Sequence, residues 1–321
     1  MASPPPAPRA EASAGYGRFD AMVVGLVAAT PVGTLRLGTA PASAAGPDLR
    51  QLLLGSEGIL GVITAVTVRV RRVPELAAYE GWRFPSFAAG VDAVRTLAQS
   101  GLRPTVVRLS DETETGLNLA DPEHVGAGAS SGALLVVGVE GDRAVAAATR
   151  GSITSLLTHL GGEPLGDEPG EAWRAGRFAA PYLRDSLLDA GVLVETLETA
   201  AFWSRLPAVY AAVKAALEAR LPGPRLVLCH VSHVYETGAS LYFTVATAEG
   251  ETPVETWLAA KAAATDAIVA SGGTITHHHA VGRDHRAWLE REIGPVGMAA
   301  LRGAKAALDP HGILNPGVLL P

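Results

Sequence analysis

The sequence has little of several features that mark large protein classes. It contains a single cysteine, Cys229, which excludes an internal disulfide and favours a reducing compartment. Only three residues are lysines, the net charge is −6 and there is no basic run, so nothing is suited to follow a nucleic-acid backbone. No apolar run reaches the ~18 residues that span a bilayer, and the proline-rich start has no apolar signal core. These absences predict a soluble cytoplasmic protein that binds no nucleic acid.

The residues that are present are typical of a globular chain. Hydrophobic residues make up 48% and charged residues 18% of the 321 positions, a balance that supports a sizeable core. At ~100–200 residues per domain the length predicts two domains or one large mixed one. Residues 1–12 are rich in proline and alanine and have little to bury, so we predict a disordered tail there.

Two regions with different patterns follow this tail. Residues 13–74 predict a hairpin at 22–37, a short helix at 47–54 and a half-buried strand around 66–71. From residue 75 onwards, strands alternate with amphipathic helices, which are expected at 86–99, 142–160, 204–220, 253–271 and 295–308. Two βαβ-like halves in one antiparallel sheet predict a ferredoxin-like arrangement.

Histidines supply the first candidate functional residues. His277, His278 and His279 stand in a row between glycines, where neither a helix nor a strand is expected, so the run predicts a functional loop. Taken alone, it has an equally good structural explanation. Adjacent loop residues point in divergent directions, whereas zinc needs ligands at defined spacings, and we therefore predict no metal site. The spacing of His230 and His233 would place them on opposite faces of a strand, which predicts no metal pair there either.

A glycine string supplies the second candidate. Glycines at 55, 58 and 61 allow close approach of the backbone to a ligand, although this spacing alone is a weak signal. The wider string from Pro47 to Thr64 is far more specific and resembles the FAD-linked oxidase/transferase family with a vanillyl-alcohol-oxidase-type flavin domain. The histidine run and the ending from Leu308 to Gly317 also resemble that family, so that the resemblance covers roughly residues 13–321.

The resemblance implies an α+β fold: the second half of a PCMH/VAO-type FAD-binding domain at 13–74, and a ferredoxin-like cap, or substrate, domain with C-terminal helices at 75–321. It implies FAD as the cofactor, bound by a segment made of Glu57, Gly58, Ile59, Leu60, Gly61, Val62 and Ile63. The family's Gly-rich pyrophosphate loop is expected before Ala14, where the chain has Pro6-Ala7-Pro8-Arg9. We therefore expect the N-terminal half of the flavin domain to be missing and the flavin affinity to be low.

The histidine run and the predicted hairpin at 226–246 separate two branches of this family. Hydroxy-acid-oxidising members carry Glu-His-Gly in the loop and a second metal-ligating histidine in the hairpin. This sequence has the histidine run and Tyr242 at those places, which resembles the alkylglycerone-phosphate synthase branch. That branch exchanges the acyl chain of acyl-dihydroxyacetone phosphate for a fatty alcohol in ether-lipid biosynthesis. The resemblance assigns catalysis to Tyr242 and the three histidines, and substrate binding to Arg184 and Arg108.

The chemistry of these residue types agrees with such roles. A guanidinium offers a planar fork for phosphate, and a tyrosine beside imidazoles can move a proton. The alternatives are that Arg184 and Arg108 are ordinary ion-pair partners and that Tyr242 is a core residue. For the whole chain, the alternatives are an FAD-linked 2-hydroxy-acid dehydrogenase and a catalytically silent cap-domain remnant. A lipid-like phosphorylated substrate, peripheral membrane contact and a homodimer also follow from the resemblance as expectations.

Overall fold

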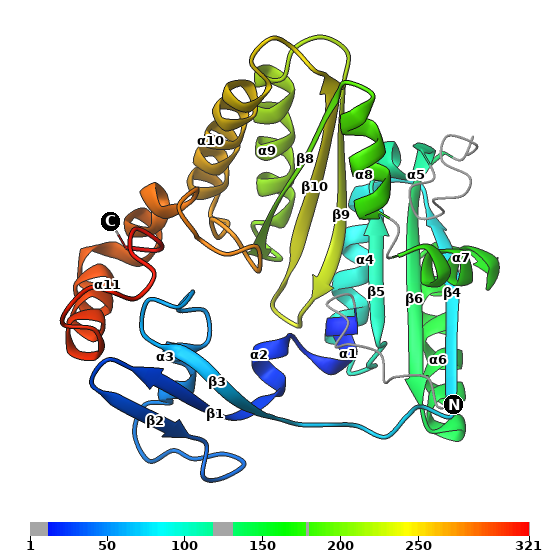
Figure 1. Cartoon of the computed structure of the whole chain (residues 1–321). Coiled ribbons are helices and arrows are strands. Elements are labelled where there is room, and N and C mark those ends of the chain that lie inside the picture. The colour runs from blue at the N-terminus through cyan, green and yellow to red at the C-terminus, as the bar shows by residue number, and fades with distance from the viewer. Residues whose placement is uncertain (1–11, 118–130, 178–179, 321) are drawn as a thin grey trace. The chain divides into compact units, whose positions relative to one another are not determined.

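The computed structural model describes residues 12–117, 131–177 and 180–320, which belong to two compact units (Figure 1). The first, here called the sheet unit, combines the chain up to Tyr16 with Val73–Gly273. The second, the loop unit, combines Gly17–Arg72 with the chain from Thr274 onwards. The change of unit between Arg72 and Val73 lies close to the predicted boundary at residue 74. The histidine run and the last helix group with residues 17–72, which the sequence did not indicate.

A seven-stranded antiparallel sheet forms the sheet unit, in the order β7-β4-β6-β5-β9-β10-β8. Its strands are β4 (Leu76–Phe84), β5 (Val106–Ser110), β6 (Ala133–Gly141), β7 (Glu163–Gly166), β8 (Val192–Phe202), β9 (Arg225–Val234) and β10 (Gly238–Ala248). The first four strands and their two helices have the ferredoxin-like order. A second βαββα half continues the sheet through the β5–β9 pair, so the predicted fold class is confirmed.

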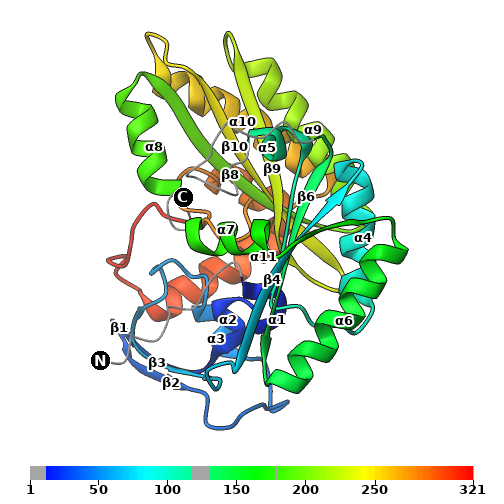
Figure 2. The same ribbon diagram turned by 90° about the vertical axis from the view of Figure 1, so that its right-hand side faces the viewer.

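Helices cover one face of this sheet. The helices of the unit are α1 (Ser13–Tyr16), α4 (Phe87–Gln99), α5 (Glu112–Leu117), α6 (Arg143–His159), α7 (Glu168–Gly176), α8 (Ala180–Asp189), α9 (Leu206–Arg220) and α10 (Pro253–Ser271). Apolar residues of α4, α6, α9 and α10 pack with alternate residues of the strands into the main core. Figure 1 shows α9 and α10 side by side along β8 and β10, and Figure 2 shows α4 and α6 on one side of β4 and β6.

The other face is covered only in part. Ala12, Tyr79, Val106, Val136 and Trp173 form a small second core there, under α7. Ala12 is the only residue of the predicted disordered tail that the structure describes, and it is buried; the rest of that tail lies outside the described residues. Beyond this small core, the same face of β5, β9, β10 and β8 carries both polar side chains and apolar ones such as Leu228 and Val194.

The loop unit is built on a three-stranded antiparallel sheet of order β2-β1-β3. It contains α2 (Phe19–Met22), β1 (Val23–Thr30), β2 (Gly33–Leu37), α3 (Leu49–Leu53), β3 (Val62–Val68) and α11 (Arg286–Leu308). The predicted hairpin and short helix are present, and the Asp48 side chain accepts a hydrogen bond from the Arg50 amide at the start of α3. Among the residues that the structure describes, none of the helices of either unit is long and apolar enough to cross a membrane.

One prediction for this unit was wrong. The strand expected to be half-buried is β3, and all seven of its residues are exposed. The alternation of Val66 and Val68 with polar residues suggested one buried face, but β3 is an edge strand that no described residue covers. The predicted closing helix at 295–308 is present as the second part of α11, because Gly294, with φ +72°, breaks the helical backbone directly before Pro295. The helical segment at 286–293, before this kink, was not predicted.

Candidate functional site

A row of polar side chains crosses the sheet unit on the face opposite α9 and α10. Ser110 of β5 lies opposite His230 of β9, His230 lies opposite Tyr242 of β10, and Tyr242 lies opposite Glu198 of β8. We call these four residues the polar row. Because side chains alternate along a strand, the neighbours of the row point into the helix-covered core: Leu109, Val231, Leu241, Phe243 and Leu197. The row therefore places Tyr242 between an imidazole and a carboxylate.

A buried ion pair holds one end of this row. Arg108 Nη2 donates to Glu114 Oε1 at 2.8 Å, and Nη1 donates to Ser110 Oγ at 2.6 Å. The Nδ1 atom of His230 lies 3.2 Å from Arg108 Nη2 and 3.1 Å from Glu114 Oε1. Arg108 and Glu114 are both buried, so the arginine that was predicted to bind substrate is turned toward protein groups.

Burial and the neighbouring charges decide the protonation of Glu114 and of His230. Burial alone would raise the pKa of Glu114, but the Arg108 guanidinium and the His230 ring outweigh burial and hold that pKa at about 2. Burial, and then the charge of Arg108, lowers the pKa of His230. At neutral pH, Glu114 is therefore ionised and His230 is a neutral imidazole.

Tyr242 lies on this neutral ring. The two rings are nearly parallel, with an interplanar angle of 14° and centroids 5.0 Å apart. Burial raises the pKa of Tyr242, although a hydrogen bond with the Thr196 side chain acts in the opposite direction. The phenol consequently keeps its proton at neutral pH and can donate it.

A β-bulge turns a further histidine toward the same face. The β9–β10 register shifts between the pairs Val234–Ala239 and Val231–Leu241, and both valines pack in the helix-covered core. The His233 amide donates to Ser240 Oγ at 3.0 Å, and the ring Nδ1 lies 3.4 Å from the same oxygen. The prediction that His230 and His233 point to opposite faces is wrong, because the extra residue of the bulge shifts the alternation by one.

The other predicted substrate-binding residue, Arg184, lies on α8. Its Nη2 donates to Glu195 Oε1 at 2.8 Å, and the arginine side chain is 41% exposed. Among the described residues, its other N–H groups make no hydrogen bond. Its charge lowers the pKa of Tyr242, so the arginine acts on the middle of the polar row and retains donors for an anion.

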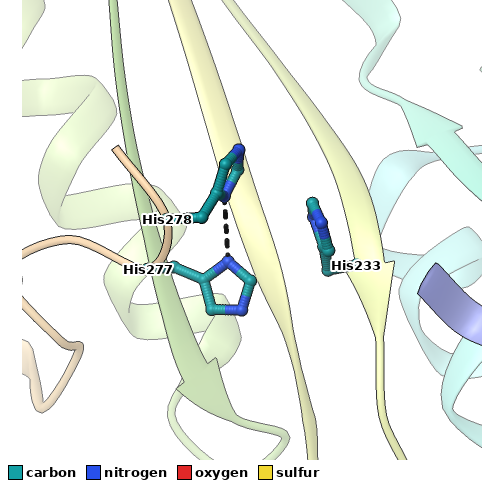
Figure 3. Close-up of side chains that lie close together, drawn as sticks. All are labelled: His233, His277 and His278. Carbon is teal, nitrogen blue, oxygen red and sulfur yellow. Dashed lines mark hydrogen bonds between the residues drawn. The ribbon is translucent and has the colours of Figure 1, made fainter. Parts of the chain in front are cut away.

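The predicted catalytic histidines are in the loop unit, in the segment Thr274–Gly282, here called the histidine loop. His277 Nδ1 and His278 Nδ1 are 3.1 Å apart and share a hydrogen bond (Figure 3). The ring of His279 lies edge-on to that of His278, with centroids 4.7 Å apart. The structure thus brings the three imidazoles together. Their expected encounter with Tyr242 involves both units and stays a prediction.

The predicted flavin segment, Glu57–Ile63, is also in the loop unit. An open glycine turn precedes this segment. Gly55 has φ +84°, and a Cβ there would meet no atom within 4 Å. Ile59 and Leu60 are buried, whereas Val62 and Ile63 are exposed at the start of β3. An open glycine turn beside exposed apolar residues fits backbone and apolar contact with a flavin. The Glu57 carboxylate is engaged elsewhere, since it accepts hydrogen bonds from the Val281 and Gly282 amides.

Sequence reasoning missed the two carboxylates of the site. Glu114 follows β5 in a run of polar residues, and only the spacing of six from Arg108 could have drawn attention to it. Glu198 stands in a strand whose other residues, apart from Glu195, are apolar or threonine, and it is nevertheless buried. A charged residue inside such a strand is the signal that could have identified it.

We expect Glu114→Gln to destabilise the protein at pH 7 by roughly 3–5 kcal/mol, because the charge of Arg108 would remain buried without its partner. The carboxylate's folded pKa of about 2 lies below its ordinary 4.5, so its contribution is present above about pH 4.5 and is lost as the pH falls toward 2. Denaturant unfolding at several pH values measures this. Glu218→Gln, at an exposed position on α9, is the control, with an expected change within about 0.5 kcal/mol. Equal stabilities of the two variants would contradict the ion pair.

Comparison with known proteins places this geometry in context. An alkyldihydroxyacetonephosphate synthase from Trypanosoma brucei brucei is 32% identical over 95% of this chain and 54% of its own length. A solved structure of an alkyldihydroxyacetonephosphate synthase superposes with a TM-score of 0.70 at 29% identity, over 95% of this chain and 55% of the other. p-Cresol methylhydroxylase shares the fold alone, with a TM-score of 0.67 at 16% identity over 94% and 65%. The chain spans about half the length of the synthases that it matches.

The match to a protein family covers most of the sheet unit and the C-terminal part of the loop unit. Residues 73–319 match the family described as FAD linked oxidases, C-terminal domain. They include the polar row, Arg108, Arg184 and the histidine loop. FAD is the cofactor that this family implies, in agreement with the open glycine turn of the flavin segment. The chain therefore belongs to the FAD-linked oxidases, whose C-terminal domain it contains.

Proposed function

We propose that the chain takes part in an FAD-dependent exchange of the alkyldihydroxyacetonephosphate synthase type, in which a fatty alcohol replaces the acyl chain of acyl-dihydroxyacetone phosphate. The observation that carries the proposal is the position of Tyr242, which lies at the centre of the polar row in a chain 32% identical to such a synthase. A core tyrosine would point into the apolar interior. Tyr242 instead lies on the opposite face, between His230 and Glu198.

The geometry supports different roles for the two arginines. Arg184 is partly exposed and has N–H groups that make no hydrogen bond with described residues, so it suits the phosphate of the substrate. Arg108 is buried and donates to Ser110 and Glu114, so it suits a structural role at the end of the row. We propose that Arg184 binds the phosphate and that Arg108 fixes His230.

Proton transfer is the contribution proposed for Tyr242. Its raised pKa keeps the hydroxyl protonated at neutral pH, and the parallel His230 ring holds the phenol in place. In this position the phenol can deliver a proton to the first carbon of the substrate. The three histidines are proposed to remove and relay the proton that this carbon gives up. When bound, FAD would supply the electrophilic ring for the exchange, with the backbone of Glu57–Ile63 as its contact.

An FAD-linked 2-hydroxy-acid dehydrogenase is the alternative. As the family resemblance implies, such an enzyme would carry a metal-ligating histidine at the position of Tyr242. A phenol with a raised pKa is a poor general base at neutral pH and a poor metal ligand. The polar row therefore favours the exchange reaction over the oxidation of a hydroxy acid.

For Tyr242→Phe in the FAD-loaded protein, we expect at least a 100-fold loss of alkyl exchange, and of deuterium uptake at the first carbon from deuterated water, because the phenol proton is gone. Mass spectrometry of substrate and product measures both. Tyr210→Phe is the control, since the Tyr210 hydroxyl donates to Asp111 and its ring packs against the helix-covered core. Normal turnover and deuterium uptake in Tyr242→Phe would show that this residue only packs, and turnover of D-lactate would favour the dehydrogenase.

For Arg184→Lys, we expect KM for the phosphorylated substrate to rise about tenfold or more with a smaller change in kcat. An ammonium cannot reproduce the guanidinium fork, and a lost charged hydrogen bond costs about 1.5–3 kcal/mol. Steady-state kinetics measure this, with Arg174→Lys on α7 as an exposed control. If KM changed equally for a substrate analogue without phosphate, Arg184 would not be the phosphate ligand.

A further inference from the structure

Backbone strain in the described chain is concentrated at one place in the loop unit. Four non-glycine residues have a left-handed backbone: Glu57 with φ +51°, Ala280 with φ +75°, Asn315 with φ +40° and Leu319 with φ +62°. Such residues persist only where the surrounding contacts over-determine them. They are far apart in the sequence but lie in one hydrogen-bonded group around the end of the histidine loop.

Glu57 is the centre of that group. Its Oε1 accepts from the Val281 amide and its Oε2 from the Gly282 amide, both at 2.7 Å. Ala280 directly follows the third histidine, and its left-handed backbone turns the chain as it enters these two residues. One carboxylate thus binds two successive amides, an arrangement that suits an anion. The Glu57 side chain therefore holds the C-terminal end of the histidine loop.

The other two left-handed residues, Asn315 and Leu319, form hydrogen bonds with the backbone of the residues in this contact. Asn315 Nδ2 donates to the backbone oxygen of Glu57, and the Leu319 amide donates to the backbone oxygen of Gly282 at 3.0 Å. The C-terminal segment therefore contacts both partners of the Glu57 interaction. Each of the four left-handed residues is held by this group or flanks it.

A second carboxylate binds the N-terminal end of the same loop. Glu292 of α11 accepts from Thr274 Oγ1 at 2.7 Å through Oε1, and from the Ile275 amide at 2.8 Å through Oε2. Ile275 itself is buried. The three histidines thus lie between two carboxylates, each of which binds two donors of the loop.

We infer that Glu57 and Glu292 are positioning residues that hold the histidine loop, so that its imidazoles keep one arrangement. The inference gives Glu57 a role through its side chain that is separate from any backbone contact with a flavin. It rests on the proposed function only in taking these histidines as catalytic. The hydrogen bond between His277 and His278 is the feature that the two carboxylates preserve, since it requires both ring nitrogens at 3.1 Å.

The test uses the full chain with ¹⁵N-labelled histidine and needs neither flavin nor substrate. In a hydrogen bond between two Nδ1 atoms, one nitrogen carries the proton and the other accepts it, and ¹⁵N spectra distinguish these states. Glu57→Gln replaces an acceptor oxygen by an amide group that cannot accept from a backbone N–H. We expect the distinct His277 and His278 signals to merge toward averaged positions. We also expect hydrogen exchange of the Val281 and Gly282 amides to quicken at least tenfold.

Three further variants make the outcome decisive. Glu292→Gln should produce the same change in the histidine signals from the other end of the loop, and it serves alone if Glu57→Gln does not fold. Glu290→Gln, exposed on the same helix, and Ala280→Gly, which removes a side chain but no carboxylate, should keep the unperturbed spectrum. An unperturbed histidine spectrum in a folded Glu57→Gln or Glu292→Gln variant would overturn the inference, and so would averaged signals in Glu290→Gln.

Activity then separates this inference from the proposed function. If the spectra change as expected and alkyl exchange falls at least tenfold in the FAD-loaded Glu57→Gln variant, the positioned histidines are catalytic. If the spectra change while exchange stays normal, the carboxylates still position the loop, and the catalytic role of the histidines is wrong. If the spectra do not change, the positioning role is wrong whatever the activity.

Discussion

The candidate site depends on one buried ion pair. Arg108 and Glu114 lie below the surface of the sheet, where an unpaired charge would cost several kcal/mol. Burial and the charge of Arg108 lower the pKa of His230 and leave it neutral, and both side chains of the pair lie within hydrogen-bond distance of its Nδ1 atom. The ring of Tyr242 then has a flat, uncharged surface to lie on. Without the ion pair, the position of His230 would not be fixed.

The loop unit uses carboxylates in a related way. Glu57 and Glu292 bind backbone amides instead of a guanidinium, and they accept these hydrogen bonds at the two ends of a segment that contains no helix or strand. In both units, a carboxylate holds groups that fix the place of imidazoles. Charge-assisted hydrogen bonds suit this task, because they are shorter and stronger than neutral ones. A loop with three adjacent histidines can then have a defined conformation.

Much of the fold could be predicted from the sequence, because apolar periodicity is a local property. The helices α4, α6 and α10 and the hairpin of β9 and β10 are close to their expected bounds. The burial of β3 could not be predicted in this way, since burial depends on what covers a strand. Of the site, Tyr242 and the histidines were found through family resemblance. Their surroundings were not, because the β5–β9 pair joins segments some 120 residues apart and the bulge at His233 leaves no mark in the sequence.

The central proposal is that the polar row binds a phosphorylated ketone. The most direct measurement is the ¹⁵N-histidine NMR spectrum of the chain during titration with dihydroxyacetone phosphate. The account predicts a saturable shift of the His230 signals, because this ring lies beside Tyr242 in the row. It predicts no change for the exposed His159 and His311. Signals of His230 that stay fixed while only exposed histidines respond would contradict the account.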